Sequence, residues 1–250
     1  MASQPCAWVQ AARADSNAHI RLFCFPYAGG GASLFRHWQQ DLSPDIEVRP
    51  IQLPGRENRL REAPFSQLTT LVDTLFPIMA RYFDRSVALF GHSMGAYIAY
   101  ELACRMEEKG VQPVRLLVSG RHAPHLLDSK SSIHALPDSD LLRAVQQRYG
   151  GIPAAVWQEP ELLRLMMPAL RADLILTETY RPSSRPKLTC PISVFGGNQD
   201  QNTNSSSLNA WQTLTRAKLR IHTLEGGHFF LHQERRKLLE LIAGDLNRNE

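Results

Sequence analysis

The fold of this chain is decided by the stretch Val87-Ala88-Leu89-Phe90-Gly91-His92-Ser93-Met94-Gly95-Ala96. An apolar run typical of a buried strand enters the pattern G-x-S-x-G, and a helical pattern follows at once. A serine at such a tight turn needs neighbours without bulk two residues away on each side, and glycines fill both positions. The free N–H groups at the start of the helix favour a developing negative charge. We therefore predict that Ser93 is a nucleophile rather than a simple helix cap.

Two later turns supply the partners that a nucleophilic serine needs, a base and an orienting carboxylate. The predicted strand that ends at Phe195 is followed, after a glycine pair, by Asp200. The predicted strand that ends at Leu224 is followed, after another glycine pair, by His228. The chain order serine, acid, histidine is the order expected for this strand–turn–helix arrangement. The sequence predicts a catalytic triad of these two residues and Ser93.

Other acids and histidines fit these roles less well. Asp84 precedes the strand that leads to Ser93, and Asp173 lies inside a helical pattern. His92 points away from the tip of the turn in this motif, so we interpret it as a structural histidine.

A glycine-rich turn, residues 28–31, follows the predicted first strand Ile20–Phe25. Such turns also bind dinucleotides, but the G-x-G-x-x-G spacing is missing here, which argues against a nucleotide site. Beside a nucleophilic serine, the same turn supplies one N–H group to an oxyanion hole. We predict the backbone N–H groups of Ala28 and Met94 as the two oxyanion donors.

Short apolar runs alternate with longer helical patterns along the chain, which predicts a mostly parallel central sheet flanked by helices. Together with the serine turn, this predicts the α/β-hydrolase fold as a single domain over residues 1–250. The expected strands are Ile20–Phe25, Glu47–Leu53, Ser86–Phe90, Val114–Ser119, Ile192–Phe195 and Leu219–Leu224. The expected helices are Ser33–Leu42, Phe65–Phe83, Met94–Lys109, Asp138–Arg148, Glu161–Thr179, Leu208–Thr215 and Gln233–Asn247.

Residues 122–180 break this alternation, because two helical patterns follow one another with no strand between them. A helical insertion in an open α/β sheet usually lies over the carboxyl ends of the strands, where ligands bind. We interpret it as a helical lid; the alternative is an extension that covers one edge of the sheet.

Composition excludes several classes of protein. The 250 residues are 43% hydrophobic and carry a mild net charge of +4, with no nucleic-acid-like block of basic residues. The four cysteines are widely spaced, so we expect reduced thiols and no metal site. Because neither a signal peptide nor an apolar run of membrane-spanning length is found, we expect a cytoplasmic protein that does not bind membranes. We also expect a monomer.

The motifs together resemble the type II, or external editing, thioesterases of polyketide and nonribosomal peptide synthetases. The matching stretches, in chain order, are residues 25–33 (F-P-Y-A-G-G-G-A-S), 53–57 (L-P-G-R-E), 91–95 (G-H-S-M-G), 170–173 (L-R-A-D), 178–180 (E-T-Y), 196–200 (G-G-N-Q-D) and 226–230 (G-G-H-F-F). The serine motif alone is generic, whereas the combination of the other motifs is specific and spans nearly the whole chain.

The resemblance implies a thioesterase that removes stalled or aberrant acyl groups from the phosphopantetheine arm of acyl or peptidyl carrier proteins. It implies no cofactor of the enzyme's own, since the substrate carries the phosphopantetheine, and it implies the same triad, Ser93, Asp200 and His228. Two alternatives stay open on the residues alone: a stand-alone carboxylesterase or lipase-like hydrolase with this triad, and a non-catalytic binding protein of hydrolase fold.

A carrier protein is acidic around its attachment serine in such systems, so we expect basic residues near the active site. Arg56, Arg59 and Arg61 follow the end of the second predicted strand, on the same side of the sheet as the serine. They are the predicted docking residues.

Overall fold

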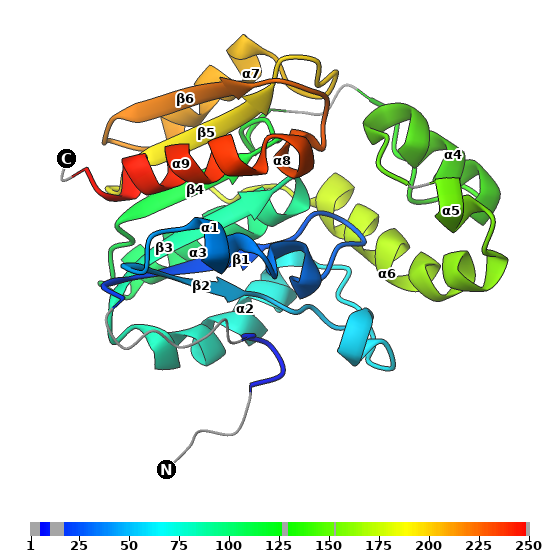
Figure 1. The fold of residues 1–250 in the computed structure, drawn as a ribbon, viewed down its shortest axis with the longest axis horizontal. Helices are drawn as coiled ribbons and strands as arrows, with labels where there is room; N and C mark the ends of the chain where they lie inside the picture. The colour runs from blue at the N-terminus through cyan, green and yellow to red at the C-terminus, as the bar shows by residue number, and fades with distance from the viewer. Residues whose placement is uncertain (1–5, 11–17, 127–129, 153, 249–250) are drawn as a thin grey trace.

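The computed structural model describes residues 6–10, 18–126, 130–152 and 154–248 (Figure 1). In this part of the chain six strands form one sheet, and every adjacent pair is parallel. The sheet order is β2-β1-β3-β4-β5-β6. The strands are β1 (Ile20–Phe25), β2 (Ile46–Pro50), β3 (Ser86–His92), β4 (Arg115–Ser119), β5 (Ile192–Gly197) and β6 (Leu219–Leu224). The predicted fold class is confirmed.

Helices cover both faces of the sheet, because alternate residues of the central strands point to opposite sides. In β1, Leu22 and Cys24 join the core under α1 and α9, whereas Phe23 and Phe25 join the core under α2 and α3. Figure 1 shows α1 and α9 in front of the sheet and α2 behind it. The helices of these two layers are α1 (Trp38–Asp41), α2 (Leu68–Met79), α3 (Met94–Glu108), α7 (Ser205–Asn209), α8 (Phe230–Gln233) and α9 (Arg235–Leu246).

Between β4 and β5 the chain forms α4 (Asp138–Tyr149), α5 (Ala154–Trp157) and α6 (Pro160–Thr179) at one end of the sheet. We call these three helices the insertion. A small core of its own, which includes Leu141 of α4 and Leu174 of α6, holds it together. The predicted insertion, residues 122–180, also contains residues 127–129 and 153, which lie outside the described residues. No helix that the structure describes is both long and apolar enough to span a bilayer.

Helix boundaries differ from prediction where side chains or short 3-10 turns intervene. The expected helix Ser33–Leu42 is replaced by a 3-10 turn, Ala32–Phe35, followed by the four residues of α1. Helix α7 begins three residues earlier than expected, because the Asn204 side chain accepts a hydrogen bond from the Ser207 N–H and caps it. The expected helix Gln233–Asn247 is observed as α9, and the short helices α5 and α8 were not predicted.

One buried carboxylate ties the last helix to the edge of the sheet. Asp245 of α9 accepts hydrogen bonds from Ser193 Oγ at 2.7 Å and Arg220 Nη1 at 3.0 Å, and lies 2.7 Å from His222 Nε2. Burial would raise the pKa of Asp245, but the bonds to His222, Ser193 and Arg220 outweigh it and hold the pKa well below its usual value.

We expect Asp245→Asn to lower the free energy of unfolding by about 2 kcal/mol at pH 7, because bonds to a charged acceptor are lost. Because the pKa of Asp245 is lower in the native state than in the unfolded chain, its ionisation stabilises the fold at pH values above the ordinary pKa of about 3.9. This contribution is lost as the pH falls through the native pKa. The difference from wild type should therefore shrink below about pH 4 in urea titrations. A difference that is constant from pH 3 to 8 would contradict this assignment, and Asp138→Asn on the exposed start of α4 is the control.

Candidate active site

Ser93 lies at the turn between β3 and α3 in a conformation that few side chains adopt, with φ 54° and ψ −114°. The two flanking glycines are required by contact distance. A Cβ on Gly91 would lie 2.0 Å from the Gly95 carbonyl oxygen, and a Cβ on Gly95 would lie 2.2 Å from the Phe25 carbonyl oxygen. The turn therefore closes tightly only with glycine at both positions and presents the serine hydroxyl beyond the end of the strand.

The structure brings the three predicted triad residues together from the ends of three strands. His228 Nε2 lies 3.0 Å from Ser93 Oγ, and His228 Nδ1 lies 2.9 Å from Asp200 Oδ2. All three residues are buried. Burial would raise the pKa of Asp200, but hydrogen bonds from His228 and Asn202 outweigh it and hold the pKa below its usual value. Asp200 is thus a carboxylate at neutral pH, and the arrangement can pass a proton from the hydroxyl to the imidazole.

Asn202 is a residue of the site that sequence reasoning missed. Its backbone N–H and its Nδ2 both donate to Asp200 Oδ1 at 2.9 Å, and Nδ2 also donates to the Arg148 carbonyl oxygen at 2.8 Å. The ring of Tyr149, at the end of α4, lies 4.9 Å from the ring of His228. The insertion therefore contacts the histidine directly through Tyr149 and reaches the acid through Asn202. The sequence signal that could have identified Asn202 is an amide side chain two residues after a carboxylate, a spacing that favours local hydrogen bonds.

His92 is fully buried among aromatic rings, and its Nδ1 lies 2.9 Å from Ser119 Oγ. Burial holds the pKa of His92 well below its usual value, so the ring is neutral. Its ring lies 5.1 Å from that of His228 and helps to pack the catalytic histidine in place. This position agrees with a structural role.

The structure places both predicted oxyanion donors at the cavity that contains Ser93. Met94 is the first residue of α3, and Ala28 follows the end of β1; both line the same small cavity as Ser93. Among the described residues neither backbone N–H donates to a protein acceptor. Both groups are therefore available to a bound oxygen atom, and their role as an oxyanion hole stays a prediction.

A buried ion pair fixes the loop that carries Ala28. Asp173 of α6 accepts from the Gly29 N–H at 2.7 Å and from both terminal nitrogens of Arg56, at 2.5 and 2.9 Å. Arg56 also donates to the Gly30 carbonyl oxygen at 3.2 Å. The motifs L-P-G-R-E and L-R-A-D are thus explained by one contact, which we call the Arg56–Asp173 clamp. It joins the insertion to the predicted oxyanion loop.

The predicted docking residues are not an exposed basic ring, which corrects the expectation from sequence. Arg56 is buried in the clamp. Arg59 is also buried: it pairs with Glu62, donates to the Gln52 carbonyl oxygen at 3.0 Å, and lies 4.0 Å above the Trp8 ring. Arg61 is exposed. Two of the three guanidinium groups are therefore engaged inside the protein and cannot meet a carrier.

We expect loss of the clamp to lower kcat about a hundredfold while KM changes little, since displacing an oxyanion donor by about 1 Å has that effect. Asp173→Leu leaves Arg56 buried without its carboxylate, which also costs about 3 kcal/mol of stability. The double variant Arg56→Met/Asp173→Leu should recover stability without recovering kcat. Full recovery of kcat in a stable double variant would show that the clamp has a structural role alone.

The cavity at Ser93 is small and mostly apolar. Its volume is about 40 Å³, and the insertion supplies much of its wall. The apolar lining consists of Val145, Tyr149, Leu170, Leu174 and Phe229, and the polar lining includes Arg121 and Thr177. Among the described residues no three histidine, cysteine, aspartate or glutamate side chains converge as metal ligands do.

Comparison with known proteins agrees with this site. A family model described as "Thioesterase domain" matches residues 20–246. The chain belongs to the thioesterase family. This thioesterase is 38% identical to the gramicidin S biosynthesis protein GrsT of Aneurinibacillus migulanus, over 98% of this chain and 95% of that protein. The type II thioesterase BorB from the borrelidin biosynthetic cluster has a similar structure, with a TM-score of 0.87, 34% identity and 98% of each chain covered. The recognition of a type II thioesterase is confirmed.

A third relative of this thioesterase carries a different activity in its name. Linear gramicidin dehydrogenase LgrE of Brevibacillus parabrevis is 37% identical over 97% of this chain and 93% of that protein. A dehydrogenase of dinucleotide type needs free backbone N–H groups and space for a pyrophosphate at its glycine-rich turn. Here the Gly29 N–H is bonded to Asp173, and a Cβ on Gly31 would lie 2.3 Å from the Glu57 carboxylate. Two carboxylates occupy the turn, which is not built to bind a pyrophosphate.

Proposed function

We propose that this thioesterase hydrolyses aberrant or stalled acyl groups from the phosphopantetheine thiol of acyl or peptidyl carrier proteins in polyketide or nonribosomal peptide biosynthesis. The single observation that carries the proposal is the Ser93–His228–Asp200 relay beneath a small apolar cavity. Family membership and the pathways named in its relatives support this substrate class. Four free cysteines are compatible with action in the reducing cytoplasm.

The reaction assigns one step to each group of the site. His228 takes the proton of Ser93 as the hydroxyl oxygen attacks the thioester carbonyl, and the N–H groups of Ala28 and Met94 hold the oxyanion. The carbon–sulfur bond then breaks, and His228 returns the proton to the departing thiol. Water, deprotonated by His228, attacks the acyl-serine ester, and Ser93 leaves with a proton as the acid is released. Asp200 holds the imidazole in the reactive tautomer throughout.

We propose that the insertion is the lid of this site within a single domain of residues 1–250. Val145, Leu170 and Leu174 form its apolar roof, which excludes water from the acyl group. The apolar lining of this cavity suits the hydrocarbon part of an acyl group.

The test compares three substrates that share one short acyl group: a carrier-protein thioester, a pantetheine thioester and the oxyester of a simple alcohol. We expect kcat/KM to be highest for the carrier-protein thioester and lowest for the oxyester, because a thiol of pKa about 8.5 leaves more easily than an alkoxide. Labelling of Ser93 by an active-site phosphonate should run in parallel with loss of activity. Preference for the oxyester would favour the carboxylesterase alternative, and an unlabelled, inactive protein would favour the binding protein.

A further inference from the structure

The last two residues of α4 lie against the residues that orient the nucleophile. We call these two residues, Arg148 and Tyr149, the α4 end. The carbonyl oxygen of Arg148 accepts a hydrogen bond from Asn202 Nδ2 at 2.8 Å, and the Tyr149 ring lies 4.9 Å from the ring of His228. One short segment of the insertion thus meets both the histidine and the residue that contacts the acid.

The α4 end is attached to the rest of the protein less firmly than α6 is. The Arg56–Asp173 clamp that holds α6 is a buried ion pair with two hydrogen bonds. Arg148, Tyr149 and Asn202 are only half-buried, and the hydrogen bond from Asn202 to the Arg148 carbonyl oxygen joins two neutral groups. Such a bond contributes less than a buried, charged one. The α4 end is therefore the part of the insertion that can be released at the lower cost in free energy.

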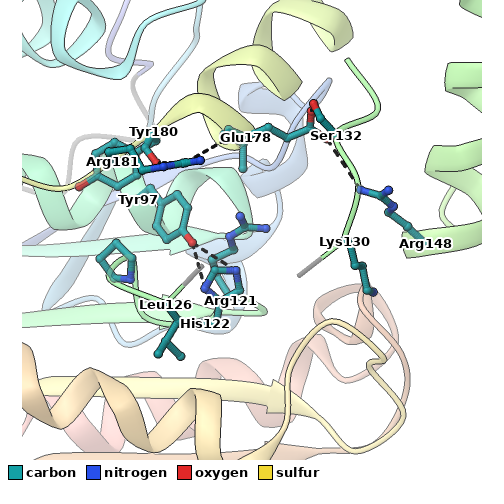
Figure 2. A pocket seen from close by; sticks show the side chains of 12 residues that line it. Tyr97, Arg121, His122, Leu126, Lys130, Ser132, Arg148, Glu178, Tyr180 and Arg181 are labelled. Atoms are coloured by element: carbon teal, nitrogen blue, oxygen red, sulfur yellow. Dashed lines mark hydrogen bonds and ion pairs between the residues drawn. The ribbon is translucent and has the colours of Figure 1, made fainter. Parts of the chain in front are cut away.

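The side chain of Asn202 bridges the insertion and the catalytic acid. Its Nδ2 carries two hydrogens and has two acceptors, Asp200 Oδ1 at 2.9 Å and the Arg148 carbonyl oxygen at 2.8 Å. Its Oδ1 accepts from Lys130 Nζ at 2.6 Å. Arg148 and Lys130 line one cavity of about 260 Å³, where Figure 2 shows them on α4 and on the segment before it. The amide nitrogen therefore faces the acid and the helix, and the amide oxygen faces the lysine.

Two acceptors of negative character meet at this amide nitrogen. The Arg148 carbonyl lies in the last turn of α4, where carbonyl groups lack partners within the helix and carry a partial negative charge. Asp200 is a carboxylate, and its Oδ1 also accepts from the backbone N–H of Asn202 at 2.9 Å. When the α4 end moves away, water can compete for the Asn202 side chain. Asp200 is then held less firmly against His228.

We propose that Asn202 is a positioning residue that makes the orientation of Asp200, and through it that of His228, depend on contact with the α4 end. The inference rests on the proposed function and adds a control to it: the triad is aligned only while the insertion is closed. Alignment matters because a displacement of about 1 Å can slow a reaction about a hundredfold. The enzyme then attacks a thioester only after the α4 end has closed over it.

The experiment compares Asn202→Ala with Asn202→Asp on a pantetheine thioester at pH 8. Alanine removes the bridge, whereas aspartate keeps its shape but turns an oxygen toward the two acceptors. Both variants should lower kcat about tenfold, because a hydrogen bond to a charged acceptor is lost. KM should stay unchanged, because Asn202 does not line the cavity at Ser93. The matched control is Asn209→Ala, whose native side chain donates to the Ser205 carbonyl oxygen within α7; it should alter neither constant.

Two measurements without substrate separate this role from a purely structural one. Proton NMR follows the far-downfield hydrogen between His228 Nδ1 and Asp200, whose signal should broaden in both variants as this bond loosens. Hydrogen exchange follows the amides in the last two turns of α4. They should exchange about fivefold faster in both variants, because a bond between neutral groups is lost, while the amides of α3 keep their wild-type rates.

Three outcomes would overturn the inference. A lowered kcat with unchanged exchange in α4 would mean that Asn202 acts on Asp200 without the insertion. Faster exchange in α4 with unchanged kcat and NMR signal would mean that Asn202 only anchors the helix. Wild-type kcat in Asn202→Asp would show that the bridging N–H groups are not needed. If the wild-type enzyme does not hydrolyse the thioester, the proposed function fails, and the two measurements without substrate still decide the inference.

Discussion

Ser93→Ala should lower kcat/KM for a carrier-bound or pantetheine thioester by roughly three to six orders of magnitude, the range seen when a triad nucleophile is removed. The hydroxyl is the atom that attacks the carbonyl carbon, and no other hydroxyl lies within hydrogen-bond distance of His228 Nε2 among the described residues. The fold should be retained, because alanine is smaller and the turn is held by its glycines.

The measurement pairs kinetics with thermal unfolding. The melting temperature of Ser93→Ala should lie close to wild type, and Ser206→Ala, on the exposed face of α7, should be fully active. A Ser93→Ala enzyme that keeps more than about a tenth of wild-type activity would remove Ser93 from the mechanism.

Asp200→Asn should lower kcat about ten-thousandfold, by the precedent of serine proteases. The side chain keeps its shape, but its amide nitrogen can face His228 Nδ1 and stabilise the tautomer that cannot accept the serine proton. In the native site, two N–H groups of Asn202 donate to Asp200 Oδ1, and Oδ2 faces the histidine. The native carboxylate therefore favours the tautomer of His228 that can accept the serine proton.

The control for this variant is Asp138→Asn, an exposed aspartate at the start of the insertion. Activity should be compared from pH 6 to 9, because the lowered pKa of Asp200 keeps it charged over that whole range in wild type. A nearly silent Asp200→Asn would mean that another carboxylate orients His228.

Chain order and strand ends were enough to predict the fold class and the three residues that meet at the site. Each of the three follows a strand of one parallel sheet, and all such ends lie at the same edge, so local sequence fixes their place in space. The arginines were a different case. Their positions in the chain placed Arg56 and Arg59 near the site but said nothing about their burial, which depends on partners such as Asp173, 117 residues away.

Asn202 shows the same limit at shorter range. Its bond to Asp200 is local and could be anticipated, whereas its bond to the Arg148 carbonyl oxygen depends on how the insertion packs. The helix boundaries that were missed also depend on single side chains, as with the Asn204 cap of α7. Sequence patterns thus predict where strands end better than they predict which distant groups meet there.

Helix α6 has a consequence for how substrate range can change in this enzyme. It carries Leu170 and Leu174, which line the cavity at Ser93, and between them Asp173, which anchors the loop after β1. If the whole helix shifted to admit a longer acyl chain, Asp173 would move with it, the loop after β1 would be displaced, and the reaction would slow. Side-chain replacement at Leu170 or Leu174 leaves the anchor in place. Variants of this enzyme with altered chain-length preference, whether selected or engineered, should accordingly carry side-chain substitutions at Leu170 or Leu174 and an unshifted α6.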